Sequence, residues 1–148
     1  MNNQFLKLFV ALLMGLSALG PLAIAQSRDR VSFTTPFEFY VGGRKLPAGT
    51  YRVSFSRVSP SLLVIEDAQE NPRATVVGIS AYSVRPLEEA RLIFHRYGET
   101  HFLSRIWMPG TGSGSEIMKS KLELELAKGG SEETVTIVEK SRRALESR

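Results

Sequence analysis

The stretch from 91 to 107, RLIFHRYGETHFLSRIW, most constrains the fold of this 148-residue chain. Two apolar-rich segments flank Gly98-Glu99, and glycine at the first central position of a two-residue loop is typical of a type II′ β-hairpin. This register pairs Arg96 with His101. Because successive side chains of a strand alternate between faces, His95 and His101 are expected on opposite faces. One face then collects Ile93, His95, Tyr97, Phe102, Ser104 and Ile106, and the other collects Leu92, Phe94, Arg96, His101, Leu103, Arg105 and Trp107.

Short apolar segments separated by turn residues make up most of the remaining chain. Pro36 lacks an N–H, which predicts an edge strand or a strand that starts after it, and Gly78 indicates a bulge or a close backbone approach. The spacing of strands and turns is typical of a sandwich or barrel. The sequence therefore predicts a mainly β fold, an antiparallel β-sandwich or small barrel of six or seven strands with one C-terminal helix. Besides the hairpin, the expected strands lie within 31–41, 50–55, 62–67, 74–82 and 133–140.

The segment from about 115 to 128 is the expected helix, although its pattern also fits a strand. Strong helix formers dominate it, and its leucines alternate as well as stacking at helical spacing. Ser113 and Glu116 fit a capping box, and Gly129 fits a C-terminal stop. We therefore predict a helix that follows a flexible glycine-rich loop.

The first 25 residues have the features of a signal peptide. An apolar run follows Lys7, and Ala23-Ile24-Ala25 fits a small-x-small cleavage site. The alternative is a membrane anchor, but Gly15, Gly20 and Pro21 interrupt the run, and no membrane span is expected after cleavage. Residues 26–140 then form one β-rich domain, and 141–148 form a charged tail. The expected location is the periplasm or the extracellular space.

The hairpin also holds the candidate functional residues. His95 and Tyr97 share a face and are the candidates for acid–base catalysis together with a nearby carboxylate. Arg96, His101 and Trp107 are the candidates for ligand binding. The alternative for His95 is a histidine at the core edge, hydrogen-bonded to backbone or to a tyrosine. The alternatives for the other two rings are a solvated His101 near the turn and a Trp107 that anchors the sheet.

Several classes of function lack their sequence signals. The chain has no cysteine, and its two histidines do not have metal-ligand spacing, so neither a metal nor a cofactor is expected. The loop 110–115, GTGSGS, lacks the third glycine of a dinucleotide fingerprint, and no G-x-S-x-G nucleophile elbow occurs. The formal net charge is +4, but the basic residues are scattered, which argues against nucleic-acid binding.

Three motifs carry a resemblance to a known family: LPAGTY at 46–51, FHRYG…FLS…W within 94–107, and Lys119-Ser120. The chain resembles a family of small uncharacterised secreted β-domain proteins that are numerous in acidobacteria. It departs from the family where His101 replaces an aromatic residue, where Met118 replaces proline, and where 122–126 replaces a more charged helix. The resemblance implies an exported β-domain and assigns no catalytic residue.

The function expected from the sequence is that of a non-enzymatic exported β-domain protein, structural or binding, whose partner is a component of the cell envelope or a small ligand. One alternative is a barrel that binds an apolar or sugar ligand. The other is a small hydrolase or lyase that uses His95 and Tyr97.

Overall fold

The computed structural model describes residues 30–56, 59 and 61–139, and this part of the chain is mainly β with a single helix near its C-terminal end. The expected mainly β class with one C-terminal helix is therefore confirmed. The expectation of an antiparallel sandwich or barrel is not confirmed, because the strands form one open mixed sheet in which Tyr40 and Phe102 pair in parallel. The predicted signal peptide at 1–25 and the predicted tail at 141–148 lie outside the described residues. None of the helical structure in the described ranges is both long and apolar enough to span a bilayer.

The described part of the chain contains ten strands instead of the six or seven expected. Two extra strands arise because a bend at Pro36 separates β1 (Arg30–Thr35) from β2 (Phe39–Val41), and because Arg44–Leu46, which ends on the first residue of LPAGTY, forms β3. A third, β9, lies in the segment expected to be loop and helix. The elements are β1 (Arg30–Thr35), β2 (Phe39–Val41), β3 (Arg44–Leu46), β4 (Gly49–Phe55), β5 (Leu62–Asp67), β6 (Pro72–Tyr82), β7 (Ala90–Tyr97), β8 (Thr100–Trp107), β9 (Ser113–Ile117), α2 (Lys121–Gly129) and β10 (Glu133–Glu139).

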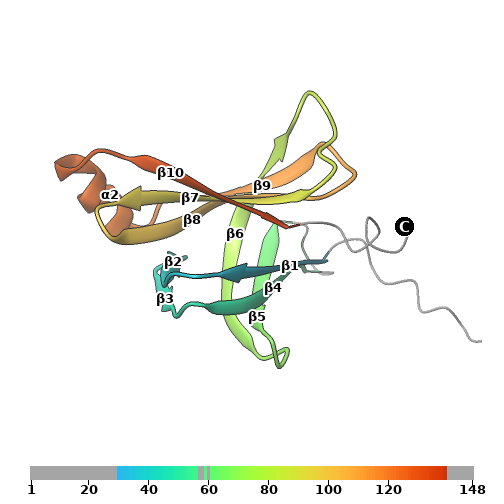
Figure 1. Ribbon diagram of the computed structural model, residues 1–148, viewed down its shortest axis with the longest axis horizontal. Coiled ribbons are helices and arrows are strands. Elements are labelled where there is room, and N and C mark those ends of the chain that lie inside the picture. Colours follow the sequence, from blue (N-terminus) through green and yellow to red (C-terminus); the bar gives the residue numbers. More distant parts are fainter. Residues whose placement is uncertain (1–29, 57–58, 60, 140–148) are drawn as a thin grey trace, which may run out of the picture.

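The strands form one open mixed sheet that folds into two layers (Figure 1). One layer contains β1, β4 and β5, and the other contains β7 to β10. The long strand β6 joins them, since its first half pairs with β5 and its second half with β9. The change of partner occurs at Gly78, where a Cβ would lie 2.9 Å from Leu63 Cδ1 and 3.0 Å from Ser115 Cβ. The close approach predicted at this glycine is confirmed.

The β7–β8 hairpin has the predicted register at its turn. Gly98 has a φ of +59° and Arg96 pairs with His101. Beyond the turn the prediction of faces is wrong, because a bulge shifts the register between Ile93 and Phe94 and leaves Ser104 as the extra residue of β8. Ile106 consequently pairs with Leu92 and lies in the core, instead of on the face of Ile93.

The predicted helix is present but begins later than 115. Ser113–Ile117 is strand β9, which pairs with both β6 and β8. The helix cap is Ser120, whose side chain accepts a hydrogen bond from the Glu123 amide, so the predicted cap at Ser113 is wrong. The C-terminal end of the helix agrees with the prediction, since α2 ends at Gly129.

Aromatic and branched side chains fill the space between the two layers. Phe39 lies at the centre of this core, with ring contacts to Phe33, Tyr51 and Phe94 at 5.4 to 6.1 Å between centroids. The core is continuous across both layers. Its largest fully buried residues are Phe33, Phe39, Phe94, Leu63, Ile65, Leu92, Ile106, Val41, Val53 and Thr35.

Candidate functional site

A polar cluster lies on the outer face of the hairpin, where α2 packs near the β7–β8 turn (Figure 1). At its centre is His95 on β7. Its Nδ1 lies 2.8 Å from Glu123 Oε1 on α2, and its Nε2 lies 2.9 Å from Ser104 Oγ on β8. Because a carboxylate only accepts hydrogen bonds, Nδ1 carries the proton, and in the neutral ring Nε2 accepts from the Ser104 hydroxyl. This arrangement is Ser–His–Glu, in the order that acyl-transfer enzymes use.

A second group of side chains adjoins this ring. The Tyr97 hydroxyl donates to Glu132 Oε2 at 2.5 Å and accepts from Lys119 Nζ at 2.9 Å. Lys119 Nζ also lies 2.6 Å from Glu132 Oε2, and Glu132 Oε1 lies 3.5 Å from His95 Nε2. The hairpin, the segment between β9 and α2, and the residue preceding β10 therefore meet at one place.

The environment of this second group stabilises the charged forms of Glu132 and Lys119 and the neutral form of Tyr97. The hydrogen bond from Lys119 and then that from Tyr97 lower the pKa of Glu132. The hydrogen bond to Glu132 and then that to Tyr97 raise the pKa of Lys119. Burial, followed by the hydrogen bond to Glu132, raises the pKa of Tyr97. Lys119 is thus a fixed cation rather than a base, and Tyr97 stays a hydroxyl donor at neutral pH.

The side chains of this polar cluster form hydrogen bonds with one another. Ser104 is 5% exposed and Glu123 is 4% exposed, so the ends of the Ser–His–Glu chain are both buried. Glu132 Oε1 lies 3.5 Å from His95 Nε2, the nitrogen that also faces Ser104 Oγ. Acyl transfer requires room beside the serine for a carbonyl carbon and for oxyanion donors, so Glu132 would have to move before a substrate could reach Ser104.

The carboxylates of Glu123 and Glu132 and the imidazole of His95 do not face a common point at which a metal ion could bind. Glu123 approaches one nitrogen of His95 and Glu132 approaches the other, on opposite sides of the ring. No set of three His, Cys, Asp or Glu side chains in the described ranges is arranged to hold a metal ion.

His101 lies on the other side of the sheet from His95, as the hairpin register predicts. It is 8% exposed and stacks on Phe37 with 3.9 Å between ring centroids, so the expectation of a solvated ring is wrong. Burial and then the charge of Arg96 lower the pKa of His101. Its Nδ1 is buried without a hydrogen-bond partner among the residues described, which suits a neutral ring packed against the core.

The remaining two candidates lie apart from the His95 cluster. Arg96 forms an ion pair with Glu133 at the start of β10. Trp107 lies against Gly114 of β9, where a Cβ would be 2.5 Å from the ring, and the Arg105 guanidinium lies 5.8 Å from the ring centroid. The sequence candidates therefore separate into His95 with Tyr97, Arg96 with its strand neighbour His101, and Trp107 at the far end of the hairpin.

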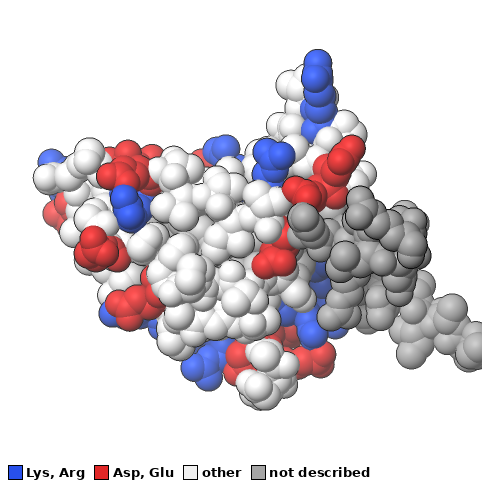
Figure 2. Space-filling model, viewed as in Figure 1, with Lys and Arg blue, Asp and Glu red and all other residues white. Residues whose placement is uncertain are grey.

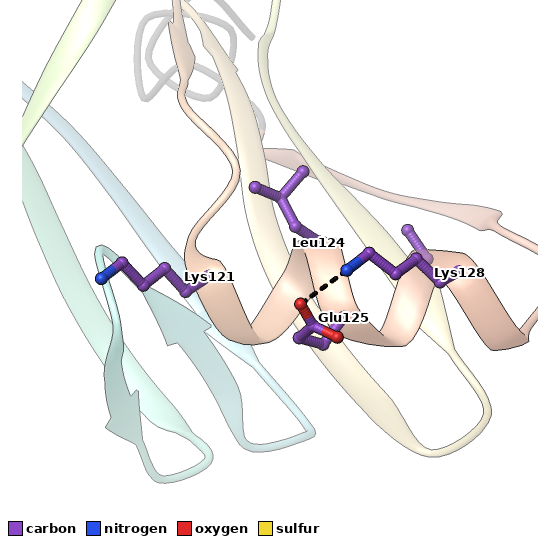
Figure 3. A pocket seen from close by; sticks show the side chains of 5 residues that line it. Lys121, Leu124, Glu125 and Lys128 are labelled. Carbon is purple, nitrogen blue, oxygen red and sulfur yellow. Dashed lines mark hydrogen bonds and ion pairs between the residues drawn. The ribbon is translucent and has the colours of Figure 1, made fainter.

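A shallow hollow on the exposed side of α2 shares no residue with the His95 cluster (Figure 3). Its side chains are Lys121, Leu124, Glu125, Ala127 and Lys128, with an ion pair of 2.7 Å between Lys128 and Glu125. Charges of both signs are interspersed on the face of the molecule shown in Figure 2. Neither surface adds a group to the chemistry around His95.

Sequence reasoning missed four members of the cluster: Ser104, Lys119, Glu123 and Glu132. Glu123 had a usable signal, since Ser120-x-x-Glu123 has the spacing of a capping box. In the structure only the serine half of that box forms, and the Glu123 carboxylate turns to His95. The expected partner of His95, backbone or tyrosine, is corrected to a serine and a glutamate.

Comparison with known proteins gives no match for this chain to a family model, a curated protein or a solved structure.

Proposed function

We propose that the chain is a non-enzymatic exported β-domain protein of the cell envelope, with a structural or binding role. The observation that carries this proposal is the intramolecular use of the hairpin's polar side chains. His95, Tyr97 and Ser104 all bond to other residues of the same chain, and these bonds attach α2 and the start of β10 to the sheet. Such a network supports a role in stabilising the C-terminal elements.

The packing of the core supports this proposal over a ligand-binding barrel. A barrel that holds a small ligand needs internal space, lined mainly by apolar side chains. Here the rings of Phe33, Phe39 and Phe94 are at most 1% exposed, and they belong to one continuous set of buried side chains between the layers. Binding at a surface therefore fits the described residues better than binding in the interior.

A second candidate function is a small hydrolase, which the Ser104–His95–Glu123 geometry favours. In that reaction Ser104 Oγ would attack an acyl carbon while His95 takes its proton, and His95 would return that proton to the leaving group. Water would then cleave the acyl-serine with His95 as base. Glu123 would hold the imidazole in the required tautomer.

Hydrolysis of p-nitrophenyl acetate by the mature protein tests the choice between these two functions. The proposal predicts equal rates for the wild type and for Ser104→Ala, at the level of free imidazole. The hydrolase predicts a burst of nitrophenolate from the wild type, and a loss of roughly 10³-fold or more in Ser104→Ala. A matched control is Ser115→Ala, because Ser115 is equally buried but lies on β9.

Export is tested with the full chain. The signal-peptide features at 1–25 and the resemblance to the secreted β-domain family support export. Expressed in a bacterium with two membranes, the protein is expected in the periplasm or the medium, with a mature N-terminus at Gln26. A cytoplasmic protein that retains Met1 would refute export and leave the structural role untouched.

A further inference from the structure

The carboxylate of Glu132 lies among side chains that come from other segments of the chain. Tyr97 comes from the end of β7, Lys119 from the segment between β9 and α2, and His95 from the middle of the hairpin. One oxygen of the Glu132 carboxylate receives Tyr97 and Lys119, and the other faces His95 Nε2. The Tyr97 hydroxyl and the Lys119 ammonium group are the donors that recognise a carboxylate here. His95 Nε2 faces the second oxygen at 3.5 Å and donates to it only when both ring nitrogens carry protons, because Nδ1 already donates to Glu123.

Tyr97 is better fixed than Glu132, whereas the Lys119 side chain is 34% exposed and is nearly as open as that of Glu132. Tyr97 is 5% exposed, and its ring packs edge-on against Phe102 with 5.9 Å between centroids. The side chain of Glu132 is 40% exposed, and its residue follows Gly129-Gly130 and Ser131, all of them exposed. Because glycine has no Cβ, this segment can change direction at little steric cost. Glu132 can therefore leave while Tyr97 stays in place.

We propose that Tyr97 and Lys119, beside His95, form a carboxylate-binding site, which Glu132 fills in the free protein and which a carboxylate-bearing ligand fills when Glu132 moves out. A ligand carboxylate would place one oxygen between Tyr97 and Lys119 and the other toward His95. The site extends the binding role proposed above and gives it a ligand class. It does not depend on export or on any reaction at Ser104.

The same geometry explains why the free site favours its own glutamate. Glu132 belongs to the same chain as the donors and directly precedes β10, which pairs with β7, so its effective concentration at them is high. An external carboxylate has to compete with this tethered group. Removal of the Glu132 side chain should therefore turn a self-occupied site into one that binds small carboxylates measurably.

Acetate rescue of Glu132→Ala tests the proposal. Acetate should raise the Tm of this variant saturably above matched concentrations of chloride, by about 5 °C at ten times the dissociation constant. The matched control is Glu125→Ala, which removes a glutamate from an exposed lysine pair without a tyrosine or histidine beside it. Adding Lys119→Met to Glu132→Ala should abolish the response. If Glu132→Ala responds to acetate no more than Glu125→Ala does, the site is refuted.

Two further measurements keep the test decisive. If Glu132→Ala does not fold, Glu132→Gln provides the same comparison, and the proposal expects it to respond to acetate more than the Glu125→Ala control. Glucuronate and N-acetylglycine then distinguish an acidic sugar from a peptide C-terminus, since the carboxylate closer to the natural ligand should saturate at lower concentration. A flat response to all three carboxylates would overturn the site and leave the exported structural role standing.

Discussion

Substitution of Glu123 by alanine tests how α2 is held to the sheet. Glu123 is the buried residue of α2, whereas Leu122 and Leu124 are 42% and 49% exposed. The helix therefore docks through a carboxylate at 2.8 Å from His95 Nδ1 instead of through Leu122 or Leu124. Its removal leaves a partly buried imidazole N–H without its carboxylate partner and takes a negative charge from the first turn of the helix.

The expected cost follows from these two losses. A hydrogen bond to a charged group contributes about 1.5–3 kcal/mol, and a charge at the helix N-terminus about 0.5 kcal/mol. Alanine regains a few tenths of a kcal/mol in helix propensity. We therefore expect Glu123→Ala to lower the free energy of unfolding by about 2–3 kcal/mol, or the Tm by roughly 10 °C.

Urea denaturation followed by circular dichroism measures this cost, and Glu125→Ala is the control. Glu125 lies two residues further along the same helix, its side chain is 69% exposed, and its partner is the equally exposed Lys128. Its removal should change stability by no more than about 0.5 kcal/mol. Equal effects of the two substitutions would refute the view that the Glu123–His95 contact holds α2 in place.

Two other substitutions test the sheet. Gly114→Ala should lower stability by about 2 kcal/mol, because the new Cβ would lie 2.5 Å from the Trp107 ring and 2.7 Å from the Ile106 carbonyl oxygen. Tryptophan fluorescence during urea unfolding measures it, and Gly129→Ala, with no neighbouring heavy atom within 4 Å, should not be destabilised. His101→Phe keeps a ring stacked on Phe37 and removes the contribution of His101 to the pH dependence of stability. Because the folded-state pKa of His101 is lowered, the unfolded state takes up the proton first, so wild-type stability should fall as pH drops below the ordinary value of 6.5. The variant should lack this component of the fall between pH 7 and 5, and an unchanged pH profile would contradict the buried neutral ring.

Local patterns predicted most of the strands. The alternation in 50–55 and the Gly98 turn depend on neighbours in sequence, and both appear as expected in β4 and in the β7–β8 hairpin. The bulge at Ser104 left no such signal. Apolar and polar residues occur at both parities of β8, so the sequence could not show where the alternation shifts.

The start of the helix illustrates a competition that local sequence could not decide. Ser113 with Glu116 and Ser120 with Glu123 both have the spacing of a capping box. The first pair became strand because β6 offers a pairing edge from Gly78 to Tyr82, which is a long-range partner. The same limit hid the cluster around His95, since its carboxylates come from positions 28 and 37 residues further along the chain.

Amide hydrogen exchange in wild type and His95→Ala tests the central claim most directly, namely that the polar cluster attaches the C-terminal elements to the hairpin. In the wild type, the amides of α2 and of the first half of β10 should exchange slowly. In His95→Ala they should exchange much faster, while those of β4 and β5 keep protection set by global unfolding. Unchanged protection of α2 in the variant would contradict the claim.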